Sequence, residues 1–253
     1  MTLPISSRKA SPSFFSDLLF PPRCPGCSSP QSIANKDSSP TGMCPECEQS
    51  LYRLHTPLCH ICSHPTQSPQ EIHCSACQQT KPSFEKATSL FVYAGVVRHM
   101  LHRYKYRSDA LAGKTIEHLM AESTASMNLE WWRFGIVTTV PLHPKRLRQR
   151  GFNQGVRLAL SIPALTKGEM HWDILQRDKA TLPQYDLTHQ ERQDNLKKAF
   201  SINKKKKILL QGQRILLVDD ILTTGATAEA CTYHLLHAGA RSVEILTLCR
   251  AVL

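Results

Sequence analysis

The stretch RILLVDDILTTGATAE, residues 214–229, decides the fold of this chain. Residues 214–218 form a short apolar run typical of a buried strand, and Gly225 precedes a segment compatible with a helix. This order predicts a strand, a loop and a helix, with Asp219 and Asp220 at the carboxyl end of the strand. Open α/β sheets bind ligands at that end, because the following helix presents unpaired N–H groups to an anion.

The predicted loop combines an anion cradle with two acids. Three hydroxyls and a glycine, which lets the backbone approach a ligand closely, form the cradle. Its residues are Thr223, Thr224, Gly225, Ala226 and Thr227. A ligand that carries both a phosphate and hydroxyl groups or a metal ion would satisfy the cradle and the acids together.

These residues resemble the phosphoribosyl-pyrophosphate (PRPP) loop of the type I phosphoribosyltransferases. A chance acidic pair on a surface turn is disfavoured, because several unusual residues coincide at fixed offsets. In that family the acids contact the ribose 2- and 3-hydroxyls, and the Thr/Gly loop holds the 5-phosphate. The resemblance implies that Asp219 and Asp220 are the catalytic acids, in an α/β fold whose parallel sheet is flanked by helices.

Length and composition limit the number of domains and the class of protein. A chain of 253 residues has room for one α/β domain and a small appendage, predicted here as residues 81–253 and 1–80. No apolar run approaches the ~20 residues of a membrane span. Residues 1–22 lack the apolar core of a signal peptide, and a short capping helix is expected there. We therefore expect no membrane insertion and a cytoplasmic location.

The net charge of +11 is unevenly placed. Residues 1–80 carry equal numbers of acidic and basic side chains, so the whole excess lies in residues 81–253. This half should favour polyanions, either a polyphosphate substrate or nucleic acid.

Eight of the ten cysteines form four C-x-x-C pairs. Each pair resembles a zinc knuckle, and tetrahedral zinc needs two knuckles, so two sites are implied. Taken in order, the first site is Cys24, Cys27, Cys44 and Cys47, and the second is Cys59, Cys62, Cys74 and Cys77. An interleaved pairing stays open. Disulfides are disfavoured without a secretion signal. His60, His64 and His73 are expected to be bystanders, and Cys231 and Cys249 to be buried thiols.

Strands are predicted at residues 87–94, 134–140, 172–176 and 243–249, and helices at 96–106, 110–122, after 151, at 190–198 and up to Ala238. We expect Leu111 to lie on the buried side of the second helix. The first helix should expose a basic face, either simply solvated or a surface for nucleic acid or a partner. That face comprises Arg98, Arg103, Lys105 and Arg107. We expect residues 177–188 to form a mobile lid or an ordinary surface loop. Residues 204–207 are expected to form a basic hairpin or loop.

The segment PLHPKRLRQR, residues 141–150, follows a predicted strand and contains no acid. Its cations are Lys145, Arg146, Arg148 and Arg150. Arginine forks and lysine point charges at the end of a strand match a polyphosphate.

Taken together, the chain resembles the ComF family, the competence-protein-F and GntX-like phosphoribosyltransferase homologues of bacteria. The motifs are LFPPRCPGC, VPLHPKRLRQRGFNQG, the PRPP loop and the ending LCRA. The resemblance implies a double zinc ribbon before the catalytic domain, with Lys145, Arg146 and Arg150 facing pyrophosphate and magnesium bound with PRPP. No separate hood for a base is evident, so the acceptor is undefined.

Two functions compete. One is a phosphoribosyltransferase that acts on an unidentified acceptor and is linked to natural transformation and DNA uptake. The other is a non-catalytic protein that binds PRPP, a nucleotide or single-stranded DNA and acts with DNA-uptake partners. Intact acids favour catalysis, whereas the zinc ribbon and the basic helix favour a macromolecular partner. A zinc-dependent scaffold alone leaves the loop unexplained.

Overall fold

A four-stranded parallel sheet forms the centre of the computed structural model, which describes residues 21–31, 39–127, 130–162, 165, 169–179 and 195–252. The strands lie in the order β1-β6-β5-β2, and each neighbouring pair is parallel. Their bounds are β1 Lys86–Val92, β2 Ile136–Thr139, β5 Arg214–Leu222 and β6 Ser242–Arg250. A separate antiparallel pair joins β3 (Leu175–Arg177) to β4 (Phe200–Ile202).

Successive residues of β5 point to opposite faces of the sheet, as the period of a strand requires. Ile215 and Leu217 pack in one hydrophobic cluster, and Leu216 and Val218 pack in the other. All nine residues of β6 are buried. A strand buried on both faces reads as a continuous apolar run, which explains why residues 214–218 and 243–249 predicted strands so clearly.

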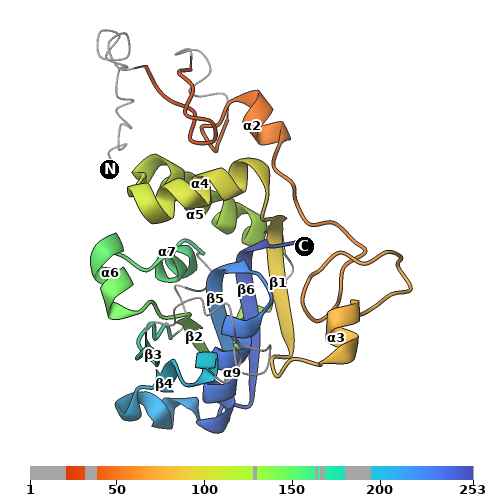
Figure 1. Cartoon of the computed structure of the whole chain (residues 1–253), viewed down its shortest axis with the longest axis vertical. Coiled ribbons are helices and arrows are strands. Elements are labelled where there is room, and N and C mark those ends of the chain that lie inside the picture. The colour runs from red at the N-terminus through yellow and green to blue at the C-terminus, as the bar shows by residue number, and fades with distance from the viewer. Residues whose placement is uncertain are drawn as a thin grey trace, which may run out of the picture.

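Helices cover both faces of this sheet (Figure 1). Helices α4 (Gly95–Arg107), α5 (Ala110–Ala125) and α7 (Gln154–Leu160) pack on one face, and α9 (Ala226–His237) packs on the other. Asp109 caps α5 by accepting the N–H groups of Leu111 and Ala112 at 3.0 Å, which supplies acceptors to an otherwise unpaired helix end. The shorter helices are α2 Pro45–Gln49, α3 Ser75–Gln79, η2 Trp131–Arg133, α6 Pro144–Arg150 and η3 Lys204–Leu210.

Three local predictions were wrong. Leu111 is 46% exposed, because the cap at Asp109 places it at the solvent side of the first turn. The strand near residue 174 begins only at Leu175, and Trp172 is 56% exposed. Residues 204–207 are neither a hairpin nor a loop but the start of the 3-10 helix η3, where Lys206 pairs with Asp173.

The cysteine-rich segment packs directly on the α/β core. In Figure 1, α2 lies above α4 and α5, and α3 lies beside β1. Cys24, Met43 and Cys47 belong to the hydrophobic cluster of α4 and α5. Cys59 and Cys77 belong to the cluster that contains α9. The boundary near residue 80 stays a prediction.

Some predictions fall on residues that lie outside the described ones. These are the capping helix in residues 1–20, most of the loop at 177–188 and the first half of the helix at 190–198. Among the helices described, none combines the length and the apolar character needed to span a membrane.

Candidate functional site

The signature loop, residues 223–225, connects β5 to α9. Gly225 has φ 85°, a left-handed conformation that favours glycine, and it caps α9. A cavity of about 40 Å³ lies against the loop, lined among others by Val140, Asp219, Thr223 and Thr227. The N-terminus of a twelve-residue helix therefore meets Asp219 at one small cavity.

The two acids lie in different surroundings. Asp220 is only 4% exposed, and its Oδ2 lies 2.5 Å from Nζ of Lys105 on α4. Asp219 is partly buried, and its Oδ1 accepts the N–H of Asp220 at 2.8 Å. Burial lowers the pKa of Lys105, but the charges of Asp220 and Asp219 outweigh it and the net shift is upward. Lys105 is therefore a charged partner of the acid pair.

Burial and the neighbouring Asp220 charge raise the pKa of Asp219 to about 8. An acid whose pKa is higher in the folded than in the unfolded protein holds a proton that unfolding releases. Its contribution therefore makes the folded protein less stable as pH rises from about 4 to about 8.

We expect Asp219→Asn to gain stability relative to the wild type as pH rises through this window, by at most about 1.4 kcal/mol per pH unit. The measurement is urea unfolding at pH 5 to 9 with zinc present, where the difference between the two proteins isolates this group. Parallel curves at all pH values would contradict the shift.

The predicted pyrophosphate cations lie on α6. Lys145 and Arg146 are exposed, as is Arg148. Arg150 is partly buried, donates to Gln154 and lies over the ring of Tyr106, 5.6 Å from its centroid. Burial lowers the pKa of Arg150, against the effect of the Asp220 carboxylate. Arg150 therefore lies within electrostatic reach of Asp220.

Sequence reasoning misplaced three cations, of which Lys105 and Arg177 belong to this site. Lys105 and Arg103 were expected on an exposed helix face, either solvated or a surface for nucleic acid or a partner, whereas Lys105 pairs with Asp220 and Arg103 is 5% exposed. Arg177 was placed at the start of a loop, but it ends β3, and the charges of both Arg146 and Asp219 act on it. Helical periodicity carries no signal for either contact. The prediction holds for Arg98 and Arg107, which are exposed.

We expect Lys105→Met to lower the free energy of unfolding by about 3 kcal/mol, because it leaves a buried carboxylate without its partner. Urea unfolding at pH 8 measures it. The matched control is Arg107→Met, on the exposed side of the same helix, and equal effects of the two changes would refute the role of the pair.

The cysteines form two clusters in chain order, which is the first of the two pairings considered. Within each cluster the sulfur atoms all lie within 4.8 Å of one another. Sγ of Cys27 lies 3.9 Å from that of Cys44, and Sγ of Cys62 lies 3.6 Å from that of Cys74. Tetrahedral zinc with Zn–S bonds of about 2.3 Å places its sulfurs about 3.8 Å apart, so these clusters fit zinc. The three nearby histidines belong to neither cluster.

The first cluster is held to α4 by Arg103. This side chain donates to the carbonyl groups of Gly26, at 3.2 Å, and Pro25, and it pairs with Asp109 at 3.0 Å. A Cβ on Gly26 would lie 2.7 Å from both Cys47 Sγ and a methyl of Val96, so this close approach requires glycine. The first knuckle is thus part of the core.

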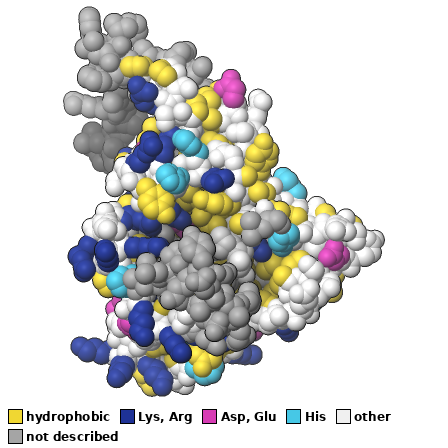
Figure 2. Space-filling model, in the orientation of Figure 1, with side chains coloured by type: hydrophobic (Ala, Val, Ile, Leu, Met, Phe, Trp, Pro, Cys, Tyr) yellow, Lys and Arg dark blue, Asp and Glu magenta, His cyan; other side chains and the backbone are white. Residues whose placement is uncertain are grey.

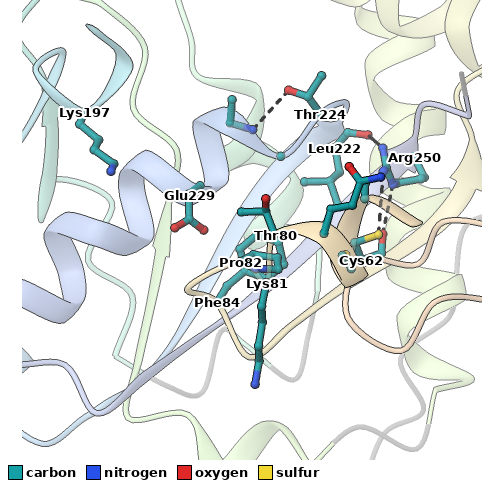
Figure 3. Close-up of a pocket in the computed structure, with 15 residues that line it drawn as sticks. Cys62, Thr80, Lys81, Pro82, Phe84, Lys197, Leu222, Thr224, Glu229 and Arg250 are labelled. Atoms are coloured by element: carbon teal, nitrogen blue, oxygen red, sulfur yellow. Dashed lines mark hydrogen bonds between the residues drawn. The ribbon is translucent and has the colours of Figure 1, made fainter. Parts of the chain in front are cut away.

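A second cavity, of about 260 Å³, lies between the second cluster and the amino end of α9 (Figure 3). Cys62, Phe84 and Glu229 line it, together with Thr224 of the signature loop. Figure 3 shows Arg250 reaching from the end of β6 toward both Cys62 and Leu222. The zinc ribbon and the signature loop are therefore neighbours.

On the face shown in Figure 2, Lys and Arg side chains are far more frequent than Asp and Glu side chains. They gather over α4 and α6 and near η3, and few Asp or Glu side chains are seen there. The uneven charge predicted from the sequence thus gives this face a basic character.

Two family descriptions match the chain. Residues 15–78 match the double zinc ribbon domain, and residues 168–251 match the phosphoribosyl transferase domain. With the parallel sheet, the signature loop and the two cysteine clusters, they define a phosphoribosyltransferase-like protein with an amino-terminal double zinc ribbon.

The similarity to curated relatives extends over most of this chain. The DNA utilization protein YhgH of Salmonella typhimurium is 30% identical over 217 residues, covering 83% of this chain and 91% of that protein. Competence protein F of Haemophilus influenzae is 28% identical over 241 residues, covering 90% and 97%. The chain belongs to this family, the ComF family.

Among solved structures, the glutamine PRPP amidotransferase from B. subtilis is similar with a TM-score of 0.36 and 16% identity. That similarity covers 54% of this chain and only 26% of the amidotransferase chain.

Proposed function

We propose that this protein binds PRPP with magnesium and transfers its phosphoribosyl group to an acceptor. The observation that supports it best is the meeting of an acid pair, a helix N-terminus and several cations at the ends of neighbouring parallel strands. A molecule with a phosphate, two ribose hydroxyls and a pyrophosphate matches these groups one by one.

In this proposal Asp219 and Asp220 accept hydrogen bonds from the ribose hydroxyls, and Lys105 moves from Asp220 toward the pyrophosphate. Residues 223–227 hold the 5-phosphate through their N–H and hydroxyl groups. Lys145, Arg146 and Arg150 face the pyrophosphate. Magnesium, bound with the substrate, supplies further positive charge to the pyrophosphate oxygens.

The reaction breaks the bond between C1 and the pyrophosphate oxygen, and pyrophosphate leaves with the electron pair. A lone pair of the acceptor, typically on nitrogen, forms the new bond to C1 from the opposite face, and the acceptor then loses a proton to solvent or a base. The protein's task is to orient the reactants and to stabilise the departing charge. Arg150 and Lys105, both shielded from solvent in part, are suited to that task.

A second candidate is a non-catalytic protein that binds PRPP, a nucleotide or single-stranded DNA during DNA uptake. The basic face in Figure 2 favours it, and so do the names of the relatives, which concern DNA utilization and competence. DNA-uptake proteins would then be its partners. Both proposals include a cytoplasmic location, because none of the ten cysteines forms a disulfide and a reducing compartment keeps zinc-binding cysteines reduced.

The test is calorimetric titration of magnesium PRPP into the zinc-loaded protein, with pyrophosphate release followed in the same samples. Release stimulated by a cell extract or by single-stranded DNA would establish a transferase. Binding without release, together with single-stranded DNA binding that weakens steeply with salt, would favour the second candidate. If folded protein does not bind PRPP, the transferase proposal fails, and of the second candidate only the nucleotide-binding and DNA-binding versions stand.

A further inference from the structure

Arg250, the last residue of β6, is a buried hub of hydrogen bonds. Its side chain is largely enclosed, with 8% of the residue exposed. Nη1 donates to the carbonyl groups of Leu222 at 3.0 Å, Ala251 at 2.9 Å and Thr223. Nε donates to the carbonyl group of Cys62 at 3.1 Å. One guanidinium group therefore holds a zinc-cluster residue and the start of the signature loop together.

The loop carbonyls that Arg250 binds decide where the loop's N–H groups point. A trans peptide is planar, with its C=O and N–H directed oppositely. Because the carbonyl groups of Leu222 and Thr223 point to Arg250, the N–H groups of Thr223 and Thr224 point away from it. An anion bound by the loop uses those N–H groups. Arg250, on the opposite side of the loop, therefore fixes the direction in which they point.

The other end of this link is anchored as well. Cys62 closes the knuckle whose Ile61 carbonyl accepts the N–H of Ala87 on β1 at 2.6 Å. The hydroxyl of Ser63 donates to the carbonyl group of Ala87 at 2.7 Å. Nη2 of Arg250 also lies 4.0 Å from Sγ of Cys62. Zinc with four thiolates has a net charge of −2, which the guanidinium group offsets.

The cavity in Figure 3 lies beside this link, between the ribbon and α9. On its other side, Glu229 of α9 accepts the N–H of Ser83 at 2.8 Å. The hydrogen bonds of Arg250 thus add to the hydrophobic cluster that Cys62 shares with Leu222 and Ala228.

We propose that Arg250 is a positioning residue that couples zinc in the second cysteine cluster to phosphate in the signature loop. The inference rests on the proposed function, since it takes the loop as the phosphate site. Loss of zinc loosens the Cys62 knuckle and releases one end of Arg250, and the cradle loses its order. Coupling between two sites is reciprocal, so a bound phosphate must also retain the zinc.

The first measurement uses the wild-type, zinc-loaded full chain. Zinc release to a chromophoric chelator is followed with and without saturating magnesium PRPP, and with inorganic phosphate as a second probe. Newly freed thiols are alkylated, and peptide mass spectrometry then distinguishes the two clusters in one sample. We expect ligand to slow alkylation of the second cluster, Cys59 to Cys77, at least about 5-fold and to leave the first cluster unchanged.

The second measurement uses Arg250→Lys and Arg250→Met, with the exposed Arg241→Met as the matched control. We expect PRPP affinity to fall about 10-fold in the Arg250 variants and ligand protection of the second cluster to disappear. Arg250→Lys, which keeps the charge but not the fork, separates the loss of geometry from the loss of charge. The control should match the wild type.

The outcomes separate the two claims. If the wild type binds PRPP but both clusters lose zinc at unchanged rates, the coupling is wrong and the proposed function stands. If calorimetry detects no PRPP binding to the wild type, both are wrong. Should the Arg250 variants fail to fold, the wild-type protection measurement decides alone.

Discussion

Changing Asp219 and Asp220 together to asparagine will reduce the affinity for magnesium PRPP at least about 100-fold. A hydrogen bond to a charged group contributes about 1.5–3 kcal/mol, and the change removes charge from two acceptors at once. An amide can accept a hydrogen bond from a ribose hydroxyl, but its oxygen attracts magnesium far less than a carboxylate oxygen does. Calorimetric titration of the zinc-loaded variant measures the loss.

The matched control for this pair is Asp173→Asn. Asp173 lies on the surface and pairs with Lys206 rather than with the signature loop, so its change should leave PRPP affinity within about 2-fold of the wild type. Circular dichroism and melting curves must first establish that the double variant is folded, because the change leaves Lys105 without its acidic partner. A folded double variant that binds PRPP as the wild type does would exclude the acids from the site.

The pH of the titration matters for the wild type. The pKa of Asp219 is raised to about 8, and the ionised carboxylate accepts hydroxyl hydrogen bonds and attracts a metal ion more strongly than the protonated acid does. Affinity should therefore rise between pH 6 and pH 8 in the wild type. The double variant lacks this carboxyl group and should show a smaller rise, because only the ionisation of the ligand's own phosphate groups, with a second pKa of about 6, is left.

The sequence predicted the central part of the fold because local patterns and fold-level rules agree there. Residues 215–218 are apolar at every position, as a strand buried on both faces requires, and the acids and Gly225 follow at fixed offsets. The paired cysteines were equally informative, since metal geometry restricts how four knuckles can combine.

Contacts between segments far apart in the chain could not be predicted from the sequence. Arg103 is on a helix whose periodicity places it outside, yet it binds the carbonyl of Gly26, 77 residues earlier. Arg250 and Cys62 are 188 residues apart. A buried arginine is stable only where acceptors surround it, and no local pattern reports acceptors supplied by another element. The long-range role of both arginines therefore emerges only from the folded chain.

Changing Cys77 to serine will remove one of two bound zinc ions and lower the melting temperature by more than about 10 °C. A serine hydroxyl is a poor zinc ligand, and apparent zinc-binding free energies in small ribbons are on the order of 10 kcal/mol. Even partial loss of that amount exceeds the few kcal/mol that shift the melting temperature of a chain of this size by 10 °C. Metal analysis and melting curves of the purified protein measure both effects.

The position of Cys77 explains why the damage should spread beyond the ribbon. Cys77 is buried in the same hydrophobic cluster as Phe84 and Leu222, so an opened second cluster exposes the core beneath the signature loop. Cys231→Ala is the matched control, because Cys231 is also buried in that cluster but lies outside the zinc set. It should keep both zinc ions and lose only the modest stability of a small core truncation. If Cys77→Ser kept two zinc ions, or melted no earlier than Cys231→Ala, zinc in the second cluster would not be what holds this side of the sheet together.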